Sequence, residues 1–144
     1  MRALYVSSMI LNDGRNPEEL FHQFVLGWFE LIANGQWAEA FAQLDLGPNY
    51  GEPYTPETYR NEIENDHFCE VTVYRQQFQE IVYSNPKEMS GHGSPNLYQI
   101  EGTSDFEFEL DIPLNMEWSD LTSGWQFIDS GAFYKVRLDW LNVL

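Results

Sequence analysis

The spacing of apolar residues changes at about Asp66. Before Asp66 apolar residues recur every three or four positions, and after it they alternate with polar residues, most regularly from Phe106 to Ile112. The first spacing is typical of helices with one buried face, and the second is typical of strands. Each layer would have an apolar face that the other must cover. The sequence therefore predicts an α+β fold in which N-terminal helices pack on an antiparallel β-sheet.

Length and charge limit the possible classes of function. The 144 residues fit one α+β domain over residues 1–144, and five Trp, eight Tyr and ten Phe provide enough apolar surface for a core. Seven basic and 23 acidic residues give a net charge of 7 − 23 = −16. This charge repels nucleic-acid phosphates and anionic lipids, so we expect neither partner. It either keeps the protein soluble or complements a basic protein partner, and both interpretations stay open.

The sequence also bears on the compartment. Cys69 is the single cysteine, which excludes an internal disulfide and is compatible with a reducing cytoplasm. The N-terminal apolar run is followed by Asn12-Asp13-Gly14-Arg15 without a small-x-small cleavage site, which argues against a signal peptide. No run of 18 apolar residues is present, as a transmembrane helix would require. These features predict a cytoplasmic protein.

Capping residues define three helices in the first half of the chain. Asn16 and Pro17 predict a helix start, and that helix should end near Gly35. A shorter helix is expected from about Trp37 to Leu44, followed by a Gly- and Pro-rich loop over 47–54. Thr55-Pro56 then predicts a third helix that ends near Asp66.

The second half predicts strands. We expect one long or bulged strand over residues 68–83, followed by two hairpins with strands over 97–101 and 105–112 and over 125–128 and 132–141. If the last strand lies beside 105–112, carboxylates should pair with basic side chains across the two strands. The predicted pairs join Glu107, Glu109 and Asp111 with Lys135 and Arg137.

Candidate functional residues fall into a few groups. The acidic face formed by Glu107, Glu109 and Asp111 fits a solvated surface better than a catalytic set, because alternation turns these side chains away from the core. His67 is the best single titratable candidate, with an ordinary capping role as the alternative. The histidines lack partners at metal-ligand spacing, so neither a metal nor a cofactor is predicted.

Aromatic residues and one polar segment supply further candidates. The five tryptophans could line a pocket inside a curved sheet, but core packing is the stronger interpretation. Trp118 to Thr122 mixes polar and large apolar residues between two predicted strands. We expect a structural loop there, with Asp120 or Ser119 bonding the backbone and Trp118 as an anchor, ahead of a binding motif.

The order of elements resembles the cystatin-like α+β roll of the nuclear transport factor 2 superfamily. The segment from Phe24 to Ala40, with its glycine corner and aromatic-started second helix, is similar to the first two helices of many members. Residues 117–122 and 138–144 are similar to a group of uncharacterised bacterial proteins. The resemblance implies helices packed on a curved antiparallel sheet.

Members of this superfamily include isomerases, dehydratases, small-ligand binders and non-catalytic partners such as immunity proteins of bacterial toxin systems. The catalytic members lead us to expect an Asp or His base with a Tyr or Asp donor inside the cone, a set that has no residue-by-residue match here. The first hypothesis is therefore a non-catalytic acidic module that binds a basic protein, for example by immunity-type inhibition. The alternative is a pocket protein, either a small-molecule binder or an enzyme, lined by His67, Tyr98 and Asp120. A homodimer through an exposed sheet face is compatible with both.

Overall fold

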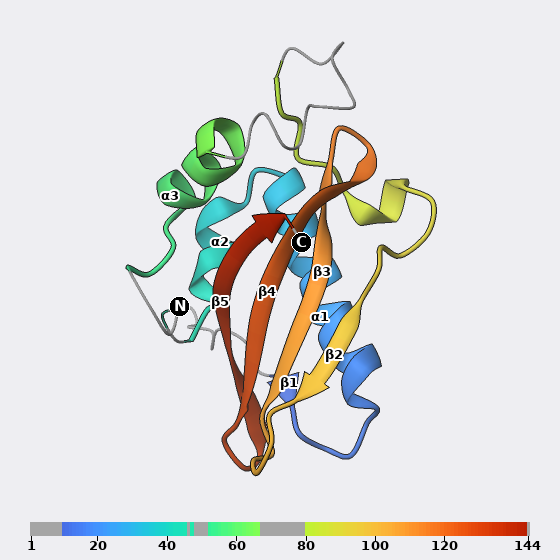
Figure 1. Ribbon diagram of the computed structural model, residues 1–144, viewed down its shortest axis with the longest axis vertical. Helices are drawn as coiled ribbons and strands as arrows, with labels where there is room; N and C mark the ends of the chain where they lie inside the picture. Colours follow the sequence, from blue (N-terminus) through green and yellow to red (C-terminus); the bar gives the residue numbers. More distant parts are fainter. Residues whose placement is uncertain (1–9, 46, 48–51, 67–79, 144) are drawn as a thin grey trace, which may run out of the picture.

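The computed structural model describes residues 10–45, 47, 52–66 and 80–143 as an α+β fold with a curved antiparallel sheet (Figure 1). The sheet has the order β1-β5-β4-β3-β2. Its strands are β1 (Ile10–Leu11), β2 (Asn96–Gln99), β3 (Phe106–Leu114), β4 (Glu117–Asp129) and β5 (Phe133–Val143). The helical elements are α1 (Pro17–Ala33), α2 (Trp37–Ala42), α3 (Pro56–Asn61), the π-helical turn η1 (Glu62–Asp66) and the 3-10 turn η2 (Pro86–Glu88).

The predicted helix starts are confirmed by their caps. The Asn16 side chain accepts hydrogen bonds from the backbone N–H groups of Glu18 and Glu19, at 2.9 and 3.4 Å. Thr55 caps α3 by accepting from the N–H of Thr58 at 3.2 Å. Because these side chains satisfy amides that have no partner inside the helix, they fix where each helix begins. The third predicted helix continues past α3 as the turn η1.

The strand predictions are confirmed only in part. The predicted strand over 68–83 falls largely outside the described residues, and its described end forms a single antiparallel bridge between Tyr83 and Leu114. Strand β1 was not predicted, and it pairs Ile10 with Tyr134 at the edge of β5. A strand of two residues is too short to show a period of two, so only its partner identifies it.

The predicted ion pairing between β3 and β5 is wrong, because β4 lies between these strands. The segment from Trp118 to Thr122, predicted to be a loop, is part of β4. A two-residue turn joins β3 to β4, with Asn115 and Met116 at φ 53° and 63°. Turns with two left-handed residues match the twist of a hairpin, but their usual sequence signal is Asn-Gly. Because methionine occupies the second position, the sequence gives no signal for this turn.

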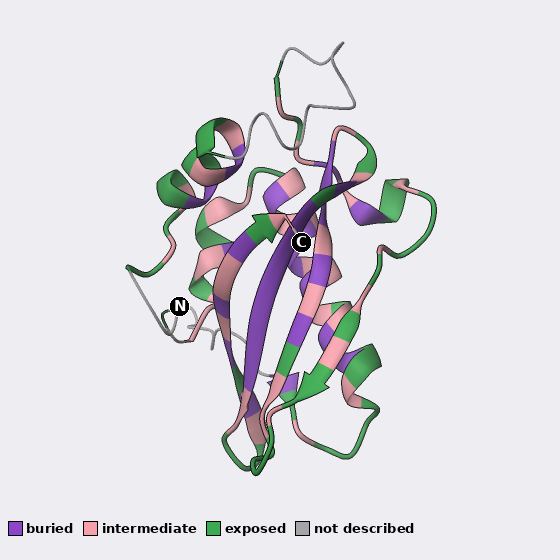
Figure 2. Cartoon of the chain, viewed as in Figure 1, coloured by how far each residue is buried: buried purple, intermediate pink, exposed green. Residues whose placement is uncertain are grey.

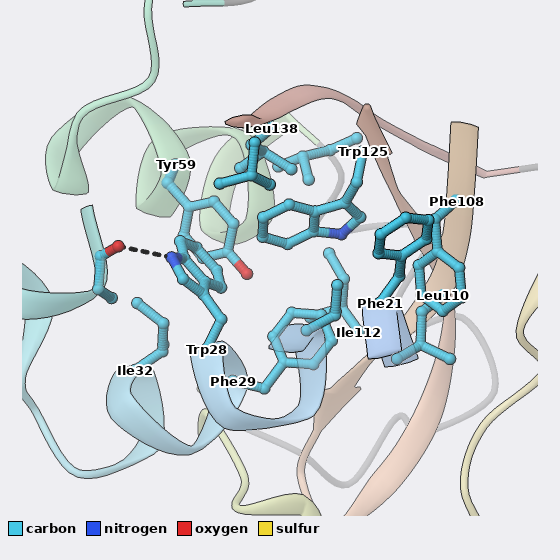
Figure 3. Close-up of a cluster of buried hydrophobic side chains, with 14 of the residues drawn as sticks. Phe21, Trp28, Phe29, Ile32, Tyr59, Phe108, Leu110, Ile112, Trp125 and Leu138 are labelled. Atoms are coloured by element: carbon cyan, nitrogen blue, oxygen red, sulfur yellow. Dashed lines mark hydrogen bonds between the residues drawn. The ribbon is translucent and has the colours of Figure 1, made fainter. Parts of the chain in front are cut away.

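The core lies between α1 and the concave face of the sheet (Figure 3). Trp28 of α1 is fully buried and meets the ring of Trp125 edge-on, with centroids 5.1 Å apart. Its indole N–H donates to the carbonyl of Ala40 at 2.7 Å, which ties α1 to α2. Tyr59 of α3 closes the cluster, and its hydroxyl has no hydrogen-bond partner within the described part of the chain. Core packing is thus confirmed for Trp28 and Trp125.

Candidate functional site

The face of the sheet that points away from α1, here called the outer face, carries most of the predicted site residues. Residues directly opposite each other on neighbouring strands share a face, so the strand register assigns the side chains to three rows. The described helices all lie on the other side of the sheet (Figure 1). The rows contain Tyr98, Glu107, Gln126 and Arg137; then Asn96, Glu109, Gly124 and Trp140; and then Asp111, Thr122 and Asn142.

Four carboxylates gather on this outer face. Glu107 is exposed, Glu109 and Asp111 are half-buried, and exposed Asp120 of β4 lies close enough to Asp111 for their charges to interact. The Gln126 amide donates to Glu107 at 3.3 Å. Within the described residues none of the four forms an ion pair, since the ion pairs found there involve other acids. We name these four side chains the acidic patch.

The environment of the acidic patch favours protonation of two of its members. Burial raises the pKa of Glu109, and the neighbouring charge of Glu107 raises it further. Burial likewise raises the pKa of Asp111, and Asp120 adds to this, against hydrogen bonds from Ser94 that lower it. Burial of each carboxylate, together with a like charge beside it, explains both directions. The patch is therefore a region of negative potential that a cation would stabilise.

Glu109→Gln is expected to stabilise the protein slightly at neutral pH. A carboxylate whose pKa is raised by folding destabilises the folded state when ionised, so its contribution improves as the pH falls through the folded-state pKa. Removing the charge should therefore raise stability by a few tenths of a kcal/mol at pH 7, with this gain shrinking toward pH 4. Thermal unfolding of both proteins between these pH values measures it. The control is Glu101→Gln in the exposed β2–β3 turn, and a Glu109→Gln protein less stable than the parent at pH 7 would contradict the interpretation.

Aromatic side chains flank the acidic patch on both sides. Tyr98 of β2 is 50% exposed beside Glu107. On the other side the half-buried Trp140 of β5 lies over Gly124, where a Cβ atom would overlap its indole ring. Figure 2 shows β4 buried along most of its length between β3 and β5. Tyr and Trp are enriched at protein-binding surfaces, and charged side chains there complement the partner's charge.

Two predicted site residues remain, His67 and Trp118. His67 lies outside the described residues. Trp118 donates its indole N–H to the carbonyl of Ser90 at 3.0 Å. Its ring also packs against Gly93, where the φ of +78° and the close approach of both Leu110 and the indole disfavour any side chain. Trp118 therefore anchors the connection that leads into β2, which is a structural role.

The space between the helices and the sheet is filled by aromatic side chains (Figure 3). Two larger hollows lie outside it. A groove of about 490 Å³ separates α1 from residues 86–92. A second hollow, of about 430 Å³, lies beside Trp37 and Tyr83. Neither hollow is lined by Tyr98 or Asp120.

The second hollow contains a carboxylate that sequence reasoning missed. Glu64 accepts hydrogen bonds from the Tyr83 hydroxyl at 2.6 Å and from Arg60 Nε at 3.0 Å, and the guanidinium lies 5.6 Å from the centre of the Trp37 ring. Burial alone would raise the pKa of Glu64, but the two donors outweigh it and hold the pKa below its usual value. A carboxylate held ionised by two donors is a weak proton acceptor. The bonds of Glu64 therefore have a structural role, because they join η1 to the segment at Tyr83. The only sequence signal for this cluster was the spacing of four residues between Arg60 and Glu64.

The described residues show neither a metal site nor a membrane-spanning segment. They contain no group of three or more His, Cys, Asp and Glu side chains placed to hold a metal ion. Among the helices described, none is both long and apolar enough to cross a bilayer. Comparisons with protein-family models, curated proteins and solved structures gave no significant match to this chain.

Proposed function

We propose that this protein is a non-catalytic binding module whose acidic patch engages a basic protein, with immunity-type inhibition as one form of that activity. The observation that carries the proposal is the set of four carboxylates on adjacent strands, for which the described residues provide no ion pair. Basic side chains of a partner would relieve the repulsion within the patch. Such complementarity speeds association and selects partners by charge.

Two further features support this proposal. The aromatic rings of Tyr98 and Trp140 border the patch and offer apolar contact area at low entropic cost. The residues described between α1 and the sheet pack ring against ring, as the fully buried Trp28 and Trp125 do. We further propose that the chain is a roll of the nuclear transport factor 2 type that acts as a partner protein, in line with the helices packed on its curved sheet.

Capture of a partner with a patch variant tests the proposal. The patch variant carries Glu107→Gln, Glu109→Gln, Asp111→Asn and Asp120→Asn. The control variant carries Glu→Gln changes at four exposed positions elsewhere, Glu52, Glu57, Glu88 and Glu101. Both variants have the same net charge. A difference in their binding therefore reports the loss of the acidic patch, and an equal change reports the loss of overall charge. Each immobilised protein is exposed to native lysate at low and high salt, and a captured protein is identified, purified and titrated against all three forms.

The expected result is one basic protein that binds the parent and the control variant alike. Binding to the patch variant should be roughly tenfold weaker or more, and high salt should weaken binding to the parent. Equal loss in both variants would show that net charge alone is responsible. A purified partner whose affinity is unchanged by the patch substitutions, or by salt, would refute the proposal.

A further inference from the structure

A preformed groove runs along the side of α1 that faces residues 86–92. On α1 its wall is one stripe at helical spacing, formed by Gln23, Leu26, Gly27 and Glu30. The opposite wall contains Pro86, Lys87, Met89, Gly91 and His92. The volume of about 490 Å³ is within the range of small-molecule sites.

The two walls are tied together at both ends of the stripe. Near the start of α1, His22 Nε2–H donates to the carbonyl of His92 at 2.9 Å. Two turns further along, Lys87 Nζ lies 3.2 Å from Glu30 Oε1. The Trp118 indole holds the same segment through its bond to Ser90. The bonds at His92 and Ser90 do not involve Glu30, so they keep the second wall in place when a ligand binds, which lowers the entropic cost of holding the ligand.

Gly27 lies in the middle of α1, in the wall that this helix contributes to the groove. A glycine inside a helix makes the helix less stable than an alanine at the same position would. A Cβ atom at Gly27 would meet no atom within 4 Å, so packing inside the protein does not require a glycine there. The missing side chain leaves the helix backbone open to the groove. A bound molecule that lies against this backbone would account for the glycine.

The charges of the groove favour a cationic ligand. The Glu30 side chain is 28% exposed, while the Lys87 side chain that pairs with it is 75% exposed. Lys87 is therefore the weakly held partner, and a ligand cation can take its place while Glu30 remains paired. An anion would have to compete with Glu30 for Lys87 and would approach a protein of net charge −16. Leu26 and Met89 make part of the groove lining apolar, so a ligand should carry an apolar group that contacts them.

We propose that this groove binds a small organic amine, with its ammonium group on Glu30 and its apolar part across Gly27. The site is separate from the acidic patch, which lies on the other side of the sheet from α1. The two proposals can therefore fail or succeed independently.

A matched set of three probes tests the inference: 3-phenylpropylamine, 3-phenylpropanol and 3-phenylpropionate. Binding is followed by amide NMR shifts of the full chain. We expect the amine to bind and to shift the amides of Gly27 and Gly91. The alcohol should bind roughly tenfold more weakly, because it lacks the charge that Glu30 pairs with, and the carboxylate more weakly still. Preference for the carboxylate, or no binding by the amine, would overturn the proposal.

Two variants and one control locate the site. Gly27→Leu fills the groove with a residue that favours helix, so amine binding should be lost while the melting temperature stays equal or rises. Glu30→Gln should remove the preference for the amine over the alcohol. Glu19→Gln, an exposed acid in the first turn of the same helix, should leave that preference intact. Unchanged amine binding in folded Gly27→Leu would place the probe elsewhere and refute the site.

Discussion

Trp28→Ala is expected to lower the free energy of unfolding by about 3–5 kcal/mol. The indole is fully buried, contacts the rings of Phe41, Tyr59 and Trp125, and donates a hydrogen bond to Ala40. Alanine would leave a cavity where α1, α2, α3 and the sheet meet, and the Ala40 carbonyl would lose one of its two donors and keep the N–H of Gln43. Urea unfolding followed by circular dichroism measures the loss.

Tyr98→Ala provides the control for that experiment. This side chain is also a large aromatic, but it is 50% exposed on the edge strand β2. Its truncation should cost less than about 1 kcal/mol. A Trp28→Ala protein that loses no more than Tyr98→Ala would show that the contact of α1 with the sheet is not the centre of the core.

Gly124→Ala is expected to destabilise the protein by about 1–3 kcal/mol, which is the usual cost of overpacking. The new Cβ atom would overlap the Trp140 indole, and Gly124 is held between β3 and β5 by ladders on both sides. The indole must then leave the outer face. Thermal unfolding gives the loss in stability, and tryptophan fluorescence reports the greater exposure of the ring.

Gly27→Ala is the matched control, because the same methyl group meets no atom there and replaces a glycine inside a helix. It should stabilise by about 0.5–1 kcal/mol. In the background of Trp140→Ala, Gly124→Ala should cost much less than in the parent, since the clash is gone. An equal cost in both backgrounds would assign the effect to the backbone of β4 instead of the indole.

The helices could be predicted closely because their signals are local. Asn16, Thr55 and Gly35 act on backbone groups within a few residues of themselves, so the sequence shows both the cap and the element that it ends. The alternation from Phe106 to Ile112 likewise gave the correct buried face of β3. In these segments local preference and tertiary packing agree.

The errors arise where the deciding contact is distant or the local signal is unusual. The start of β4 was hidden because the turn at Asn115-Met116 lacks a glycine, and the polar residues of 118–122 resembled a loop. The strand predicted over 125–128 is the end of β4, but it was not placed between 105–112 and 132–141, so Glu109 and Arg137 were expected to lie on neighbouring strands. Glu64 also accepts a hydrogen bond from Tyr83, a residue 19 positions away. The spacing on the helix indicated only the other bond, from Arg60.

The acidic patch shows both the strength and the limit of sequence reasoning. The alternating pattern correctly predicted that the side chains of Glu107, Glu109 and Asp111 point away from the core. Asp120 joins them only because β4 pairs with β3, which brings it near Asp111. The groove beside Gly27 had no sequence signal beyond a glycine within a helical pattern, because its second wall comes from residues 86–92.

The contacts of the first helix affect how the chain can fold as it is synthesised. Phe21 stacks on Phe127 with ring centroids 4.0 Å apart, and Ile10 pairs with Tyr134 at the opposite end of the described chain. On a ribosome the N-terminal segments emerge first, long before β4 and β5 exist. The apolar face of α1 can therefore be buried only after β4 and β5 have been synthesised, when translation is nearly complete. During that interval the apolar side of α1 is exposed, so we expect the nascent chain to depend on chaperones that shield such segments.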